Sequence, residues 1–248
     1  MIKAHRLRRG LGQIELSAAL GWNASPSRIS RYEQGRVVPS RSTLDRLADV
    51  FHLARDERGV LLMQAGYLPT DEEVATVLAG IKPFLEGWKG PAYLTDFTWR
   101  FLGWNRAMLA LFGFPPDEIA RLDHEKPNLL ELAFDPRWAT RRHLPEDVLT
   151  QTGRAQIARF KAQHRDRTEQ RWYRQLLQRL LRISLFRDLW NTTSPDIGSE
   201  LMHYVRYQID TPDGRLEFHA FASEMVADPR FFVILWLPAD ETTARLLA

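Results

Sequence analysis

The stretch that decides the fold is QIELSAALGWNASPSRISRYEQG, residues 13–35. Its first part, residues 13–20, has apolar residues at helical spacing and is followed by Gly21, a residue common just past a helix end. Its second part starts at Ser25, a good helix N-cap, with Pro26 at the first helical position. The stretch therefore predicts two short helices joined by a polar turn.

The second of these helices has two chemically different faces. Ile29 and Tyr32 are three residues apart and predict the face that packs inward, which leaves Ser27, Arg28 and Arg31 pointing away from it. A helix that packs on one side and offers hydroxyl and guanidinium donors on the other suits the major groove of DNA. The pattern predicts a helix-turn-helix.

The flanking sequence extends this helical unit in both directions. We expect a first helix over residues 2–9, a fourth helix capped by Ser40 and a fifth over residues 55–65 that stops at Gly66. Residues 1–41 contain eight Lys and Arg against two Glu, a local net charge of +6, whereas the whole chain has +3. A basic block of this kind favours a polyanionic partner such as double-stranded DNA over a merely solvated surface.

The composition indicates a globular protein with room for more than one core. The chain has 248 residues, of which 44% are hydrophobic, and it has no cysteine, which excludes disulfides and thiolate metal sites. The first ten residues lack the apolar segment of a signal peptide, and the longest apolar run, residues 231–237, is too short to span a membrane. We expect a cytoplasmic protein that does not bind a membrane.

Residues 66–70 combine turn-forming residues with Thr70, a good N-cap, and mark a domain boundary. A connecting helix is expected from there to about Leu85, with a break near Pro83. Two strands follow over residues 92–97 and 99–104, and then a long helical region. We therefore expect a helix-turn-helix domain over residues 1–68, a connecting helix over 69–90 and a second domain over 91–248.

Three further strands are expected at the end of the chain, over residues 204–209, 215–224 and 230–237. Thr211-Pro212-Asp213-Gly214 predicts a hairpin between the first two. The run Phe231 to Leu237 is apolar on both faces, which predicts a central strand covered above and below. The resulting fold class is an all-α helix-turn-helix domain followed by an α+β domain with a five-stranded antiparallel sheet and a helical insertion.

Catalytic chemistry is not indicated. The sequence has no glycine-rich phosphate loop and no metal-spaced histidine set. A self-cleaving serine-lysine protease domain would need a buried lysine on a β-rich domain, and the four lysines after the N-terminal domain lie outside strand-like sequence. We expect no enzyme activity, no catalytic residue, no metal and no cofactor.

The N-terminal motif resembles the phage-repressor-like (XRE) helix-turn-helix family. The match rests on residues 13–21, 29–35, Pro39-Ser40 and Leu44 to Ala48. The resemblance implies a phosphate contact by Gln13, base contacts from the recognition helix, backbone contacts near its end and a structural ion pair between Arg6 and Glu33. The DNA-binding residues that we predict are Gln13, Ser25, Ser27, Arg28, Arg31, Arg36 and Arg41.

The C-terminal part resembles the MmyB-like ligand-binding domain, which is PAS-like. The resemblance rests on Trp104-Asn105-Arg106-Ala107, Leu111-Phe112-Gly113, Asn128-Leu129-Leu130 and Phe186 to Trp190. It implies a small apolar ligand such as a bound fatty acid. The residues that we predict to line its site are Tyr93, Phe101, Trp104, Phe112, Trp190, Phe218, Phe221, Phe232 and Trp236.

Aromatic residues of this kind also simply fill cores, and a mostly apolar pocket needs a few placed polar groups. Candidates for the group that binds a carboxylate are Arg100, His203, Arg206 and His219, which the sequence does not rank. An alternative hypothesis is a repressor or antitoxin-like protein whose C-terminal domain is a protein-interaction or dimerisation module. Because one helix-turn-helix reads a short half-site, we expect a homodimer.

Overall fold

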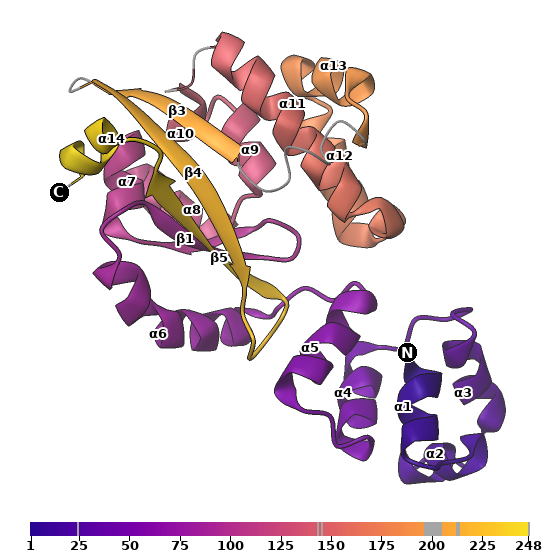
Figure 1. Cartoon of the computed structure of the whole chain (residues 1–248). Helices are drawn as coiled ribbons and strands as arrows, with labels where there is room; N and C mark the ends of the chain where they lie inside the picture. The colour runs from indigo at the N-terminus through magenta and orange to yellow at the C-terminus, as the bar shows by residue number, and fades with distance from the viewer. Residues whose placement is uncertain (24, 143, 145, 196–204, 212–213, 248) are drawn as a thin grey trace. The chain divides into compact units, whose positions relative to one another are not determined.

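The computed structural model describes residues 1–23, 25–142, 144, 146–195, 205–211 and 214–247. The chain divides into two compact units (Figure 1). The first comprises Met1–Leu68 together with Met225–Arg230, and the second comprises Pro69–Glu224 together with Phe231–Ala248.

The first unit is built from short helices around one apolar core. Ile29, Leu47 and Leu16 are fully buried in it. Because the apolar residues recur at helical spacing, each helix buries one stripe and leaves the other faces polar. Its helices are α1 (Ile2–Arg8), α2 (Gln13–Ala19), α3 (Pro26–Glu33), α4 (Arg41–Val50) and α5 (Arg55–Gln64). The predicted helices of this region are therefore confirmed, with ends within a residue or two.

Local signals set the ends of these helices. The Ser40 hydroxyl accepts a hydrogen bond from the backbone N–H of Thr43, which satisfies an N–H at the start of α4 that lacks a helical partner. Gly21 and Gly66 follow α2 and α5 with φ of +68° and +80°, a left-handed conformation that glycine adopts without strain. Ser25 precedes α3 as expected, but its side chain makes no capping hydrogen bond.

The second unit has a five-stranded sheet in the order β2-β1-β5-β4-β3 (Figure 1). All four pairings are antiparallel, and β5 lies in the centre, which confirms the prediction made from its two apolar faces. In the predicted hairpin, Thr211 pairs with Gly214; residues 212–213 lie outside the described part of the chain. The strands are β1 (Ala92–Asp96), β2 (Phe101–Trp104), β3 (Val205–Thr211), β4 (Gly214–Glu224) and β5 (Phe231–Pro238).

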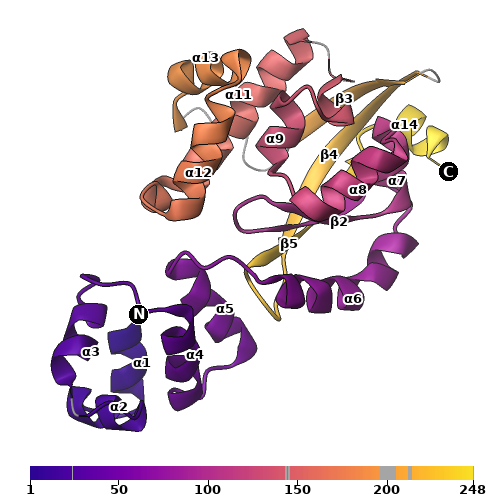
Figure 2. The same ribbon diagram turned by 180° about the vertical axis from the view of Figure 1, so that it is seen from behind.

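Helices cover both faces of this sheet. The helix α6 (Asp71–Gly87) packs Leu78 into the space that a Cβ on Gly103 would occupy, so the missing side chain lets helix and strand approach closely. On the other face, α7 (Arg106–Phe112) and α8 (Pro116–Glu125) lie over the strands (Figure 2). The helical insertion comprises α9 (Leu129–Phe134), α10 (Ala139–Arg142), α11 (Glu146–Gln163), the 3-10 turn Arg165–Arg167, α12 (Arg171–Leu180) and α13 (Ser184–Thr192), and α14 (Glu241–Leu246) ends the chain.

One prediction about α6 is wrong. The helix continues through Pro83 to Gly87 instead of breaking there. A proline inside a helix loses one backbone hydrogen bond, which tertiary packing can offset. Val74 and Val77 before the proline and Leu85 after it are all buried, and this packing holds both halves of the helix in place.

A buried asparagine fixes the start of α7 against the sheet. The Asn105 Oδ1 atom accepts hydrogen bonds from the backbone N–H groups of Met108 and Ala92, each at 3.0 Å. Its Nδ2 group donates to the carbonyl of Gly90 at 2.8 Å. Asn105 thereby caps α7 and positions the helix, and with it Phe112, over the sheet face that carries Tyr93.

Candidate functional site

The exposed face of α3 is the first candidate site. Ile29 and Tyr32 are 0% and 9% exposed and hold the helix in the core of the first unit. Ser27 and Arg31, four residues apart, are exposed, and the Arg31 Nε–H donates to the Ser27 carbonyl at 3.4 Å. The division into a buried and an exposed face is the one predicted from the sequence.

Arg28 is exposed but held in place. Its guanidinium carbon lies 4.1 Å from the centroid of the Trp22 ring, and its Nε–H donates to the Tyr32 hydroxyl at 2.9 Å. A guanidinium stacked on an indole keeps its remaining donors while losing little entropy on binding. The half-buried Ser25 joins this side through its backbone N–H, which donates to the Ser17 hydroxyl of α2 at 2.9 Å.

A buried polar network joins α1, α2 and α3. The Arg6 Nε–H donates to Glu33 Oε1 at 2.6 Å, which confirms the predicted ion pair. Gln13 Nε2 donates to the other carboxylate oxygen at 2.9 Å. Burial by itself would raise the pKa of the Glu33 carboxyl, but the hydrogen bonds from Arg6 and Gln13 lower that pKa below its ordinary value. The charged pair stays intact at neutral pH and fixes where Gln13 lies.

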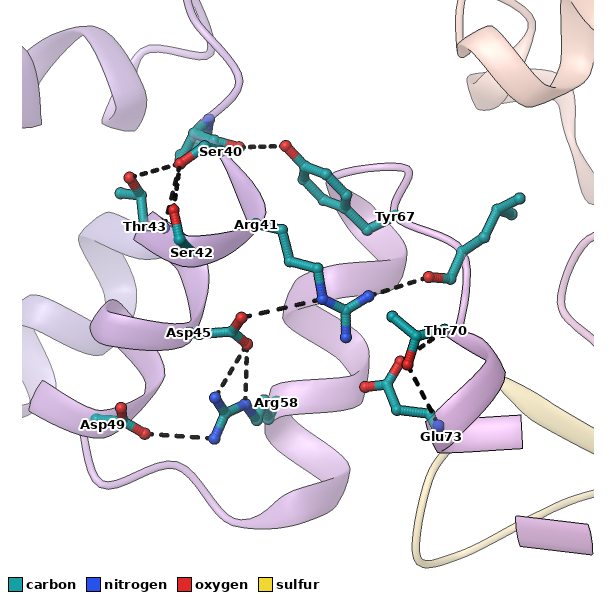
Figure 3. Close-up of polar contacts among 12 residues, drawn as sticks. Ser40, Arg41, Ser42, Thr43, Asp45, Asp49, Arg58, Tyr67, Thr70 and Glu73 are labelled. Atoms are coloured by element: carbon teal, nitrogen blue, oxygen red, sulfur yellow. Dashed lines mark hydrogen bonds and ion pairs between the residues drawn. The ribbon is translucent and has the colours of Figure 1, made fainter. Parts of the chain in front are cut away.

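The last two predicted DNA-binding residues differ in their contacts. Arg36 follows α3 and is exposed. Arg41 is half-buried, donates to the Leu68 carbonyl at 3.1 Å and lies 3.9 Å from the Asp45 carboxylate (Figure 3). Asp45 in turn accepts from Arg58 at 2.9 Å. The structure therefore places Arg41 in a network that links α4 and α5, and its guanidinium is not a fully exposed donor.

The second candidate site is the sheet face that α7 and α8 cover. The structure brings seven of the nine predicted ligand residues into one apolar cluster. Phe101 and Trp104 stack in parallel with ring centroids 5.1 Å apart, and Trp236 contacts Phe218 at 5.4 Å and Phe112 at 6.0 Å. The seven residues are Tyr93, Phe101, Trp104, Phe112, Phe218, Phe232 and Trp236.

Phe221 and Trp190 lie apart from this cluster. Side chains alternate between the two faces of a strand, so Phe221 points away from the face that carries Phe218, and it is 53% exposed. Trp190, on α13, stacks on Phe186 at 5.4 Å, with the Lys161 ammonium 4.3 Å from its ring centroid. Alternation along the predicted strand separates Phe221 from Phe218, whereas the position of Trp190 depends on packing between helices.

Small residues lie among the aromatic ones on this face. Ala220 pairs with Trp236 and Ala222 pairs with Ile234 across β4 and β5. Both alanines are half-buried and pack against the aromatic cluster. Larger side chains at these two positions would lie directly opposite Trp236 and Ile234 of the neighbouring strand.

Tyr207 and Gln156 belong to this region and were not predicted from the sequence. Tyr207, on β3, stacks on Trp236 with centroids 4.5 Å apart and planes 8° from parallel. Gln156 Nε2, on α11, donates to the Tyr207 hydroxyl at 3.3 Å. Alternation with Ile209 in the expected strand was a signal that could have placed Tyr207 on the buried face; no such signal exists for Gln156.

The polar groups suggested as a carboxylate anchor are dispersed. Arg100 Nε donates to the buried Asp96 carboxylate at 2.6 Å. Arg206 pairs with His219 across β3 and β4, one residue out of phase with the pair formed by Tyr207 and Phe218. His203 lies outside the described residues. The Arg100 side chain is bound to Asp96, and His219 follows Phe218 directly along β4, so neither of these two side chains lies on the face of the apolar cluster.

Within the described ranges, no three His, Asp or Glu side chains come together as a metal site would require. No helix in the same ranges has both the length and the apolar character needed to cross a membrane.

Comparisons with known proteins address both units. Residues 77–248 match the family model described as MmyB-like transcription regulator ligand binding domain. Residues 2–61 match a model described as helix-turn-helix domain. No curated protein gives a significant match to the chain.

Proposed function

We propose a ligand-sensing role for this chain, which belongs to the family of the MmyB-like transcription regulator ligand binding domain and, with its helix-turn-helix domain, is a DNA-binding transcription regulator. In this proposal the C-terminal domain senses a small apolar ligand such as a fatty acid. The observation that carries the proposal is one apolar cluster that contains seven of the nine predicted aromatic residues and against which Ala220 and Ala222 pack. A long flexible apolar chain gains about 0.8 kcal/mol per buried CH₂ on such a surface.

For DNA, we propose that α3 enters the major groove. Ser27, Arg28 and Arg31 are exposed on the face opposite Ile29 and Tyr32, and arginine reads guanine with two parallel hydrogen bonds. Ser25 lies at the start of that helix. The contacts that position the helix without reading bases come from Gln13, Arg36 and Arg41.

The regulator is proposed to act as a homodimer. A single recognition helix contacts only a few base pairs, so useful specificity requires two half-sites about one helical turn apart. Sedimentation of the protein alone and on its selected DNA sequence tests this proposal. A dimer on a near-palindromic site is expected, and a monomer in both conditions would exclude it.

Sensing requires that the ligand binds two states of the protein with different affinity. The test replaces Ala220 with Phe and Ala222 with Leu, which fill the positions opposite Trp236 and Ile234. We expect both variants to lose co-purified lipid and to show a DNA affinity that no longer responds to added fatty acid. The DNA sequence is first obtained by selection in vitro.

Ser223→Gln is the matched control, because Ser223 is exposed on the opposite face of the same strand. It should retain both the lipid and the response. The sensing model is wrong if the Ala220 or Ala222 variant loses its lipid and the DNA affinity of the wild type does not change on addition of fatty acid. The lipid would then be a structural filler.

A further inference from the structure

A polar cluster lies at one end of the apolar face, where α11 meets the sheet. Tyr93, Tyr207 and Trp236 come from β1, β3 and β5, and Trp236 is 4% exposed. Gln156 reaches them from α11 through its 3.3 Å hydrogen bond with the Tyr207 hydroxyl. Packing of α11 against the sheet thus brings hydroxyl, indole and amide groups together inside an otherwise apolar region.

Two buried polar atoms of this cluster lack partners. Among the described residues, neither Gln156 Oε1 nor the Trp236 indole Nε1 has a hydrogen bond of good geometry. A buried polar atom without a partner costs free energy in most folds, so such atoms mark a place where another polar group is expected. The Trp236 N–H lies close enough to the Tyr93 hydroxyl to lower its pKa, although the contact falls short of hydrogen-bond geometry.

Arg159 supplies a positive charge to this cluster. It lies three residues after Gln156 on α11, on the same side of the helix, and is half-buried. Its guanidinium carbon is 5.6 Å from the centroid of the Trp99 ring. No hydrogen bond or ion pair of the Arg159 side chain is found within the described ranges, so its donors are available to an acceptor.

The two tyrosines remain hydrogen-bond donors. Burial raises the pKa of both the Tyr93 and Tyr207 hydroxyls; Trp236 beside Tyr93, the hydrogen bond from Gln156 to Tyr207 and, more weakly, the positive charge of Arg159 offset only part of that rise. Both hydroxyls are therefore protonated at neutral pH. A half-buried guanidinium beside two buried phenols and an indole N–H offers donors and no negative charge, which is the arrangement that stabilises a carboxylate.

Three neighbouring cations are already engaged. Arg100 is paired with Asp96 at 2.6 Å. Lys161, two residues after Arg159, donates to the carbonyls of Trp190 and Thr193 at 2.6 and 2.9 Å. Arg154, earlier on the same helix, is exposed and lies 3.5 Å from the Thr192 hydroxyl. Among the described cations of α11, Arg159 is the one without a hydrogen-bond or ion-pair partner, and its charge acts on both tyrosine hydroxyls.

We propose that the apolar ligand carries a carboxylate, which binds Arg159 and the hydroxyls of Tyr93 and Tyr207 while its hydrocarbon chain lies along the aromatic face. The inference rests on the proposed function, because it assigns the polar end of the same site. It replaces the four anchors suggested by the sequence with Arg159, a residue of the helical insertion.

The experiment compares hexadecanoic acid with its methyl ester, using tryptophan fluorescence of the full-length, delipidated protein. The wild type should bind the acid more tightly than the ester. Arg159→Gln should weaken acid binding by roughly ten- to a hundredfold, the range for a hydrogen bond to a charged group, and leave ester binding unchanged. Tyr207→Phe, which removes only the hydroxyl, should show a smaller loss in the same direction.

Arg154→Gln is the matched control and should behave as the wild type, while Arg159→Lys should recover part of the preference for the acid. Thermal melting checks that each variant is folded. Equal binding of acid and ester by the wild type, or an acid preference that survives in Arg159→Gln, would contradict the proposed carboxylate contact. The proposal of an apolar ligand would be unaffected by either result. Failure of the wild type to bind either lipid would instead contradict the proposed function itself.

Discussion

The two units of this protein build their candidate sites in opposite ways. In the first unit, called the helical unit below, all seven proposed DNA contacts lie within residues 13–41, and the recognition face is one side of a single helix, α3. In the second unit, called the sheet unit below, the proposed ligand face combines residues from Tyr93 to Trp236, which only strand pairing brings together. A site on one helix depends on local spacing, whereas a site on a sheet depends on register and on which layer covers it.

The same contrast applies to buried charge. The helical unit buries the ion pair of Arg6 and Glu33, whose side chains are 8% and 4% exposed. The ligand face contains Arg159 with no described carboxylate partner. A paired buried charge stabilises a fold only while both partners remain, and an unpaired one beside an apolar face is a place for a ligand. The first charge therefore stabilises the fold, and the second is the one that we propose for ligand binding.

The largest expected effect separates the two units. Arg6→Met should destabilise the helical unit by about 3–5 kcal/mol, because it leaves the Glu33 carboxylate buried without its cation. DNA binding should be lost while the sheet unit still binds lipid. Gel shift assays and lipid binding on the same preparation measure the two properties.

The control for this variant is Arg8→Met. Arg8 pairs with Glu57 at 2.9 Å, but its side chain is 65% exposed, so solvent screens the interaction and no measurable loss is expected. If Arg6→Met abolishes lipid binding as strongly as DNA binding, the two units do not fold independently and the comparison above fails.

Arg31→Ala should weaken binding to the selected DNA sequence by about 1–3 kcal/mol and relax preference at one base pair. Gln13→Ala should weaken all sequences alike, because a phosphate contact positions the protein without reading bases. Lipid binding should be unchanged in both variants. Selection in vitro with each variant is the measurement, and an unaltered sequence preference for Arg31→Ala would contradict a base contact.

A pair of equivalent helix caps tests the two units against each other. Ser40 caps α4, and Thr70 caps α6 by accepting from the Glu73 backbone N–H at 3.2 Å (Figure 3). Ser40→Ala and Thr70→Ala should each cost about 1 kcal/mol. In calorimetry, Ser40→Ala should shift the melting of the helical unit and Thr70→Ala that of the sheet unit. A common shift in both variants would show one cooperative transition.

The smallest expected effect is a dependence of stability on pH in the sheet unit. Burial lowers the pKa of His164, although hydrogen bonds with the carbonyls of Phe97 and Phe160 oppose the shift. Below the unfolded pKa of about 6.5, the unfolded chain binds a proton that the folded chain binds more weakly, so acid favours unfolding. Stability should fall as the pH drops through this value.

Denaturant titrations at several pH values measure this dependence. His164→Gln should flatten the dependence below about pH 6.5, the unfolded pKa of histidine. The exposed His124 provides the control, since His124→Gln should leave the wild-type profile intact. A profile that is equally steep in all three proteins would assign the acid sensitivity to other groups.

Much of the first unit could be predicted because its signals are local. The glycines after the helices, the cap at Ser40 and the spacing of Ile29 and Tyr32 all act within one or two helical turns. The pair between Arg6 and Glu33 followed from a family resemblance, because the spacing of those two residues along the chain does not reveal it.

In the second unit, the sequence by itself determined the strand content, the hairpin and the central position of β5, because a strand that is apolar on both faces must be covered on both. Only the tertiary structure decided that Trp190 lies apart from the apolar cluster, that helix α6 continues through Pro83 and that Arg159 comes near enough to Tyr93 and Tyr207 for its charge to act on their hydroxyls. The physical reason is that these outcomes depend on strand register and on packing between segments far apart in the chain, where a shift of one residue moves a side chain to the opposite face.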